Sequence, residues 1–143
     1  MKIKEIMSKE IASLKPDDPI ETAAQLMKQY DVGSIPVCEN QKVVGIITDR
    51  DIALRSVAVG QNTKSQKVSD IMTTNITIGN PEMNVHDAAR IMSEKQIRRL
   101  PIVESNSLVG MVSLGDISLE PALQDDAEDA LKDISQPSAN QIQ

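Results

Sequence analysis

The chain carries one pattern twice. When residues 3–52 are moved along by 65 positions, they align with residues 68–117 without a gap, and thirteen of the fifty pairs are identical. Many of the other pairs exchange one aliphatic residue for another, which indicates that the two copies share one backbone. A period this long with only two copies argues against a solenoid and predicts a pseudo-twofold pair of similar halves.

Both copies show the same succession of structural signals. Apolar residues at helical spacing follow a capping residue, and short apolar runs flank polar turns. This order predicts a β-α-β-β-α unit in each copy, and therefore an α+β fold with helices on one face of a sheet. The expected strands are residues 10–14, 34–38 and 43–48 in the first copy, and residues 75–78, 99–103 and 108–113 in the second.

The helices have recognisable start signals. Asp18 is followed by Pro19, which suits the first helical position, and Asn84 stands before the matching helix of the second copy. Asp and Asn side chains accept hydrogen bonds from the free N–H groups at a helix start, so both are predicted N-caps. A second helix is expected to open near residue 49 in the first copy and near residue 114 in the second.

The repeat also sets the expected domain boundaries. The first motif covers residues 1–56 and the second covers residues 68–120, with a linker at residues 57–67. The remaining residues, 121–143, form an acidic C-terminal tail. Each half is too short to bury much surface alone, so the two halves are expected to share one core.

Most of the negative charge lies in the tail. The formal net charge of the chain is −6, and residues 120–143 carry six acidic side chains against one lysine. The remaining body is nearly neutral and has no basic face, so nucleic-acid binding is not expected.

Residues 134–143 are expected to be disordered. Residues 122–132 are compatible with a short acidic helix that has Leu123, Ala127, Ala130 and Leu131 on one side.

Cysteine and histidine usage excludes several classes of site. The single cysteine, Cys38, cannot form an internal disulfide, which fits a reducing compartment. No apolar run is long enough for a signal sequence or a membrane span, so we expect a cytoplasmic protein without membrane attachment.

His86 is the only histidine and is expected to be solvated, and one His with one Cys is not a metal site. No nucleophile–base pair or Gly-rich phosphate loop stands out, so neither catalytic residues nor enzymatic activity are expected.

A hydroxyl and a carboxylate recur where the second helix begins. Thr48 precedes Asp51 by three residues, and Ser113 precedes Asp116 by the same spacing. One interpretation is a capping box, in which each side chain bonds to the backbone of the other residue. The other is nucleotide binding, because the hydroxyl can donate to phosphate and the carboxylate can accept from both ribose hydroxyls. The spacing alone leaves both interpretations open.

The chain as a whole resembles a tandem pair of cystathionine-β-synthase (CBS) domains, the Bateman module. The resemblance covers residues 1–119 and consists of an Ile-Met start, an Ala-Ala-x-x-Met helix, an Ile-Pro-Val or Leu-Pro-Ile strand and a Gly-x-x-Thr/Ser-x-x-Asp-Ile close, each present twice. It implies two CBS motifs packed as a pseudo-twofold pair, with two adenosyl-binding clefts where the halves meet. The implied ligand is AMP, ADP or ATP, with S-adenosylmethionine or NAD as alternatives and no catalytic cofactor.

The resemblance assigns ligand contacts to both copies by position. Asp51 and Asp116 would hold the ribose, while Thr48 and Ser113 would meet the phosphates. The other assigned residues bracket the base or face the phosphates: Ile11, Gly33, Ser34, Ile35, Pro36 and Arg50 in the first copy, and Ile76, Arg98, Arg99, Leu100 and Pro101 in the second.

The copies differ most where phosphate is expected. Gly33-Ser34 in the first copy aligns with Arg98-Arg99 in the second, and guanidinium groups form forked, charge-assisted bonds to phosphate. A solvated helix end is the alternative explanation for these arginines. Arg50 aligns with Gly115, so the first copy carries a charge at another position. We therefore expect two unequal sites, the phosphate-rich one near Arg98-Arg99.

These features support two functions of different classes. The first is an adenosyl-nucleotide sensor that acts in trans on an effector protein that the sequence does not identify. The second is a protein-interaction scaffold with no physiological ligand in its clefts. A homodimer is expected in either case, because paired CBS modules commonly associate and because the aliphatic body exposes apolar surface.

Overall fold

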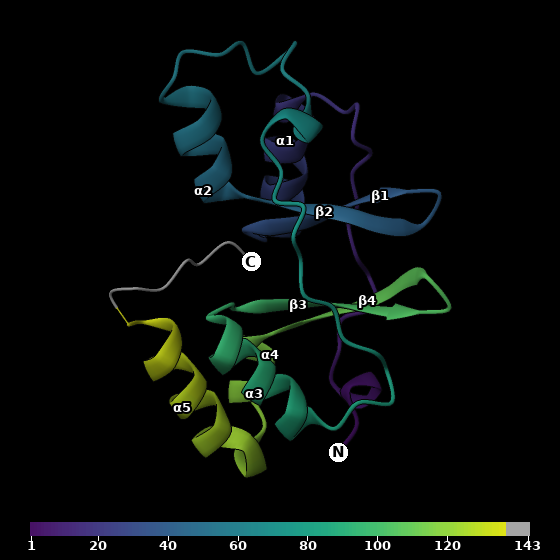
Figure 1. Cartoon of the computed structure of the whole chain (residues 1–143), viewed down its shortest axis with the longest axis vertical. Helices are drawn as coiled ribbons and strands as arrows, with labels where there is room; N and C mark the ends of the chain where they lie inside the picture. The colour runs from purple at the N-terminus through teal and green to yellow at the C-terminus, as the bar shows by residue number, and fades with distance from the viewer. Residues whose placement is uncertain (137–143) are drawn as a thin grey trace. The chain divides into compact units, whose positions relative to one another are not determined.

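The chain folds into two compact units. The structure, a computed structural model, describes residues 1–136, and the expected disorder of residues 137–143 lies outside the described residues (Figure 1). One unit is the unbroken stretch Ile11–Ile76, named here the contiguous unit. The other combines Met1–Glu10 with residues 77–136 and is named the split unit. Each unit has its own hydrophobic core, in contrast to the single shared core expected from the sequence.

The two units are built from equivalent elements, and both are α+β, as predicted. The contiguous unit contains α1 (Ile20–Tyr30), β1 (Ser34–Glu39), β2 (Lys42–Thr48) and α2 (Asp49–Ile52), which continues as a π-helical segment, Ala53–Val57. The split unit contains α3 (Val85–Lys95), β3 (Arg99–Glu104), β4 (Ser107–Ser113), α4 (Leu114–Ser118) and α5 (Gln124–Ile134).

The two units exchange their opening segments. A 3₁₀ turn at Val68–Asp70, from the start of the second sequence copy, lies in the contiguous unit, where Val68 N donates to Asp18 O at 2.8 Å. The equivalent turn at Ile3–Glu5 lies in the split unit, where Ile3 N donates to Met83 O at 2.8 Å. Each compact unit therefore joins the body of one sequence repeat to the first turn of the other.

Each unit contains one antiparallel hairpin, which the sequence predicted to within one residue at each end. Strand β1 pairs with β2 from Ser34–Thr48 to Glu39–Lys42, and β3 pairs with β4 from Arg99–Ser113 to Glu104–Ser107. Both hairpins have a bulge at the equivalent place, after Val37 and after Ile102. The shared bulge supports the inference that the repeated sequence encodes one backbone.

The predicted strands at residues 10–14 and 75–78 are wrong. The first segment makes one parallel bridge, Leu14 with Val37, and next to the second segment Gly79 makes one with Ile102. A proline follows each bridge residue after two positions, Pro16 and Pro81. Proline lacks an N–H group, so a longer ladder cannot continue through it.

Only one of the two predicted N-caps is correct. Asn84 caps α3, because its Oδ1 accepts from His86 N at 2.8 Å. The cap residue of α1 is Pro19, while Asp18 Oδ2 accepts from Lys15 N at 2.8 Å and stabilises the preceding turn. Carbonyl groups of residues 63–66, part of the predicted linker, accept from the first N–H groups of α1 and make a side-chain cap unnecessary.

The acidic tail begins with a helix that is part of the split unit. Helix α5 packs against α3 and α4, as Figure 1 shows, and buries Ala127, Ala130 and Ile134. Leu131, expected on the same face as the two alanines, is 46% exposed. Ile134, expected in the disordered part of the tail, instead ends α5 and is fully buried.

The described helices are short. Within residues 1–136, none combines the length and the apolar character that crossing a membrane requires.

Candidate functional site

In the contiguous unit, the Thr48–Asp51 cap joins the end of β2 to the start of α2. Thr48 Oγ1 accepts from Asp51 N at 3.0 Å, and Asp51 Oδ2 accepts from Thr48 N at 2.9 Å. The two residues are only 7% and 6% exposed. The arrangement is a complete capping box, so the first interpretation of the motif describes the geometry correctly.

The capping box does not exhaust the bonding capacity of these side chains. Thr48 Oγ1 uses an acceptor position in the cap, which leaves its own hydrogen available for donation. Asp51 Oδ1 lies 3.9 Å from Arg55 Nε, beyond hydrogen-bond length, while Oδ2 is held by the backbone. The cap therefore leaves one hydroxyl hydrogen and one carboxylate oxygen that its backbone groups do not use.

Ser34 stands directly across the hairpin from this cap. It pairs in register with Thr48, and the preceding residue, Gly33, accepts a hydrogen bond from Asp49 N at 2.9 Å. Ser34 is 6% exposed, and its Oγ has no hydrogen-bond partner among the described residues. A buried hydroxyl without a partner costs about 1–3 kcal/mol, so a group that supplies a bond here gains that energy.

Arg55 belongs to this site and was not among the predicted residues. It lies four residues after Asp51, with Nη1 donating to Ile71 O at 3.2 Å. The spacing of Asp51 and Arg55 is the i,i+4 spacing of a helical ion pair, and this signal is present in the sequence. The predicted Arg50 is exposed, and its backbone N donates to Asp49 Oδ1 at 2.8 Å.

The Ser113–Asp116 cap of the split unit has the same geometry. Ser113 Oγ accepts from Asp116 N at 3.1 Å, and Asp116 Oδ2 accepts from Ser113 N at 2.9 Å. Both residues are half-buried, so this cap is more accessible than its counterpart.

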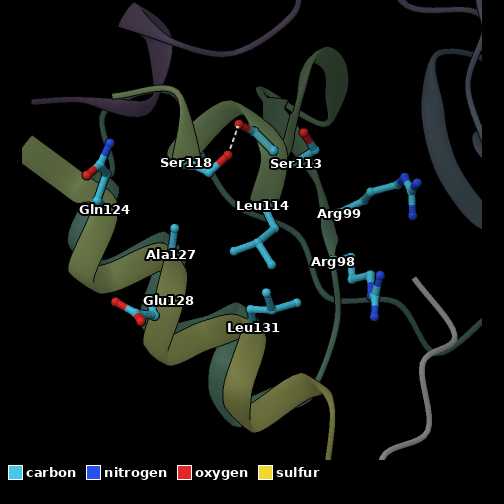
Figure 2. Close-up of a pocket in the computed structure, with 10 residues that line it drawn as sticks. Arg98, Arg99, Ser113, Leu114, Ser118, Gln124, Ala127, Glu128 and Leu131 are labelled. Atoms are coloured by element: carbon cyan, nitrogen blue, oxygen red, sulfur yellow. Dashed lines mark hydrogen bonds between the residues drawn. The ribbon is translucent and has the colours of Figure 1, made fainter. Parts of the chain in front are cut away.

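The hairpin of the split unit brings the two predicted arginines to this cap. Arg99 pairs in register with Ser113, and Arg98 O accepts from Leu114 N at 2.9 Å. Arg98, Arg99 and Ser113 line one pocket of about 560 Å³, which Figure 2 shows together with helix α5. The replacement of Gly33-Ser34 by Arg98-Arg99 therefore places two cations beside a cap of the same geometry.

The apolar residues expected to bracket a base divide into two groups. Ile35 and Leu100 are 1% and 0% exposed and fill the core of their own unit. Pro36 and Pro101 are buried and, as the next residues in each strand, point to the opposite face of the hairpin. Pro36 and Pro101 therefore lie on the face of each hairpin opposite to Ile35 and Leu100, which occupy the cores.

Ile11 and Ile76 are the first and last residues of the contiguous unit. Both are half-buried and lie outside any helix or strand. Neither is brought to a cap by a hydrogen bond among the described residues.

The remaining chemically reactive side chains lie away from the caps. Burial raises the pKa of the Cys38 thiol, which disfavours the nucleophilic thiolate. His86 is exposed, as expected, and its Nδ1 lies 2.5 Å from Asp126 Oδ2 of α5. Among residues 1–136, no group of three or more His, Cys, Asp or Glu side chains is arranged to hold a metal ion.

Two observations bear on the family of this chain. It contains a repeated α+β unit, and each copy has a hydroxyl–carboxylate cap at the same place. The family model described as "CBS domain" matches residues 3–57 and 68–121, one match for each sequence copy. The chain belongs to the CBS domain family. The two matches cover most of the chain and make it a tandem CBS pair.

The curated relatives match this chain over very different shares of their own length. The CBS domain-containing protein YhcV of Bacillus subtilis is 45% identical over 133 residues, which cover 93% of this chain and 94% of that protein. The inosine-5'-monophosphate dehydrogenase of Methanocaldococcus jannaschii is 35% identical over 118 residues, but these cover 81% of this chain and only 23% of the enzyme. The likeness to that enzyme therefore concerns a minor part of its length.

Solved structures share the fold of this CBS pair. Hypoxic Response Protein I, crystallised with two coordinated zinc ions, has a TM-score of 0.77 and 26% identity over 84% of this chain and 98% of that one. The CBS domain pair of protein MJ0100 was solved in complex with 5'-methylthioadenosine and S-adenosyl-L-methionine. It has a TM-score of 0.73 and 31% identity, and the match covers 83% of this chain and 94% of that one.

Proposed function

We propose that this CBS pair is a regulatory sensor that binds an adenosyl nucleotide at its two caps and acts in trans on a separate effector protein. The observation that carries the proposal is the buried, unpartnered Oγ of Ser34 opposite the Thr48–Asp51 cap. The adenosyl complex of the MJ0100 pair supports the ligand class.

Each cap has the chemistry that a ribose phosphate requires. Asp51 and Asp116 each keep a carboxylate oxygen that no backbone N–H of the cap uses, and it can accept from ribose hydroxyls. Thr48 and Ser113 can donate to phosphate. Ser34 adds a hydrogen bond in the contiguous unit, and Arg98 and Arg99 add positive charge in the split unit. The two sites should therefore differ in affinity for ligands of different phosphate charge.

No catalytic step is assigned to this chain. The proposal gives the caps a role in holding a ligand, and the match to the dehydrogenase of Methanocaldococcus jannaschii covers only 23% of that enzyme. Regulation requires a ligand that binds two states of the protein with different affinity. We propose AMP, ADP or ATP as this ligand, with S-adenosylmethionine and NAD as alternatives, in a cytoplasmic protein.

We also propose a homodimer, since the contiguous unit exposes several large apolar side chains. Tyr30, Val32, Leu54 and Val57 are 44%, 42%, 49% and 62% exposed. Sedimentation equilibrium tests this arrangement, and a monomer at micromolar concentration contradicts it. Hexameric CBS-CP12 relatives show that higher assemblies occur in similar folds.

Thermal unfolding with AMP, ADP, ATP, S-adenosylmethionine and NAD tests ligand binding. A ligand present at 100 times its dissociation constant should stabilise the protein by about 2.7 kcal/mol. We expect Asp51→Asn or Asp116→Asn to reduce the stabilisation, because an amide preserves an acceptor for the cap but loses the negative charge. Asp49→Asn is the matched control, since Asp49 is an exposed neighbour.

The outcomes separate the two functions. The absence of stabilisation by any adenosyl ligand overturns the sensor and favours a scaffold in which the caps serve only the helices. Stabilisation that persists unchanged in both Asp51→Asn and Asp116→Asn keeps the sensor but refutes the site.

A further inference from the structure

Helix α5 borders two grooves of different composition in the split unit. On its α3 side, a groove of about 430 Å³ is lined by three α5 carboxylates, Asp126, Asp129 and Asp133, together with Arg90 and Lys132. On its α4 side lies the pocket of about 560 Å³ that contains Arg98 and Arg99. The acidic residues of the helix thus gather mainly in one groove, and the other groove combines cations with apolar side chains.

The apolar wall of this pocket comes from α4 and α5. Figure 2 shows Leu114 and Leu131 pointing toward the same space, with Ala127 beside them. Leu131 is 46% exposed although its neighbours in α5, Ala130 and Ile134, are buried. The pocket therefore leaves a large aliphatic side chain open to a ligand.

Arg98 and Arg99 supply the cationic side of the pocket. In Figure 2 their side chains extend on the far side of Leu114 from α5. Among the described residues that line the pocket, Glu128 is the one carboxylate, and in Figure 2 it points away from the arginines. This part of the lining therefore carries two positive charges and one negative charge, which favours an anion.

We propose that this pocket binds a small amphipathic anion, a carboxylate, sulfonate or phosphate ester on an aliphatic or aromatic body. The anionic group lies at Arg98 and Arg99, and the body packs against Leu114, Ala127 and Leu131. A volume of about 560 Å³ suits such a molecule.

This pocket shares Arg98, Arg99 and Ser113 with the phosphate side of the proposed nucleotide site and extends it along α5. Gln124, Ala127, Glu128 and Leu131 lie on α5, outside the residues matched by the CBS model. Asp116, the assigned ribose contact, does not line the pocket. The site therefore depends on the C-terminal helix of this chain and requires no nucleoside.

Two matched fluorescent probes test the pocket on the full chain. The first, 8-anilino-1-naphthalenesulfonate, is an aryl anion, and the second, N-phenyl-1-naphthylamine, is its neutral analogue. We expect saturable binding of the sulfonate and about tenfold weaker binding of the neutral probe, the effect of losing about 1.4 kcal/mol. Equal affinity for the two probes overturns the anion requirement.

Substitutions then locate the probe. Arg98→Gln and Leu131→Gln are each expected to weaken sulfonate binding about tenfold, and both alter exposed side chains, so the fold should persist. Arg90→Gln and Lys132→Gln are the controls, since these residues line the other groove. Unchanged affinity in Arg98→Gln and Leu131→Gln, or an equal loss in the controls, overturns the proposal. A failed nucleotide experiment does not affect this outcome, because the probes contain no nucleoside.

Discussion

The two units share a plan but differ in what covers their helices. Ala24 of α1 and Ala89 of α3 occupy equivalent positions in the repeat, yet Ala24 is exposed and Ala89 is 3% exposed. Helix α5 accounts for the difference, because it packs on α3 and has no counterpart in the contiguous unit. A repeated sequence therefore creates equivalent surfaces, and a short helix outside the repeat determines which of them is buried.

The caps differ in their electrostatic surroundings as well. Asp51 has Arg55 nearby at 3.9 Å, whereas the position equivalent to Arg55 in the second copy is Glu120. In the split unit the nearby positive charge comes instead from Arg98 and Arg99, at the start of β3, the strand that pairs with Ser113. The same hydroxyl–carboxylate motif is thus paired with positive charge from different elements in the two units.

The largest expected difference in stability is between substitutions at Ala89, which α5 covers, and at Ala24, which is exposed. Ala89→Asp should destabilise the protein by about 3–5 kcal/mol, because it buries an unpaired charge at the α5 contact. Ala24→Asp should change stability by no more than about 0.5 kcal/mol, as expected at an exposed site. Chemical denaturation of both variants measures the difference, and equal effects would show that α5 does not cover α3.

A second contrast concerns two equivalent glycines. A Cβ at Gly45 would lie 2.6 Å from Met72 Sδ and 2.9 Å from the backbone oxygen of Thr73, whereas the three atoms nearest to a Cβ at Gly110 all belong to the side chain of Met7. A flexible methionine can move more easily than a backbone carbonyl. Gly45→Ala should therefore cost about 1–3 kcal/mol, and Gly110→Ala should cost less. Denaturation midpoints test the ranking, and the reverse order contradicts it.

A smaller effect on stability is expected from the charged residues beside the two caps. Arg55→Gln should lower stability by at most about 1 kcal/mol, because its ion pair with Asp51 is long and Arg55 is half-exposed. Glu120→Gln at the equivalent position is the comparison, and no loss is expected there. A loss in Glu120→Gln as large as that in Arg55→Gln would remove the electrostatic distinction between the caps.

The smallest expected effect is the pH dependence of stability that arises where Glu82 contacts Lys2 and Lys4 of the exchanged N-terminal segment. Hydrogen bonds from Lys2 and Lys4 lower the pKa of Glu82 from 4.5 to about 2. This contribution to stability is therefore present above pH 4.5 and is lost as the pH falls through about 2. Melting temperatures between pH 2 and pH 6 should vary less in Glu82→Gln.

The contiguous unit provides the control for this pH effect. Its equivalent pair, Lys67 with Asp17, is a single contact of 3.5 Å. Asp17→Asn should therefore alter the acid-side profile less than Glu82→Gln, and an equal or larger change would contradict the assignment.

Local signals in the sequence predicted the hairpins and failed where distant segments meet. Alternating apolar residues and polar turns located β1 to β4, because both signals act within a few residues. The Asp18 cap was wrong because the carbonyls of residues 63–66 satisfy the N–H groups of α1. The exchange of opening segments had no sequence signal, since the Lys2-Ile3 and Lys67-Val68 pairs are chemically interchangeable.

The prediction of the site had the same limits. The cap residues and their hairpin neighbours do lie side by side in the structure, because the repeat fixes their register. Arg55 was missed although its i,i+4 spacing from Asp51 was visible. The pocket beside α5 depends on contacts between the tail and the repeat, which no local pattern encodes.

The exchange of opening segments has a consequence for folding during synthesis. The contiguous unit is complete once residue 76 has left the ribosome, because all its parts are consecutive. Met1–Glu10 must wait until the second hairpin has been made, since Ser8 bridges to Met111. Contacts between distant segments form slowly, so the N-terminal residues are the first to be synthesised and among the last to find their partners.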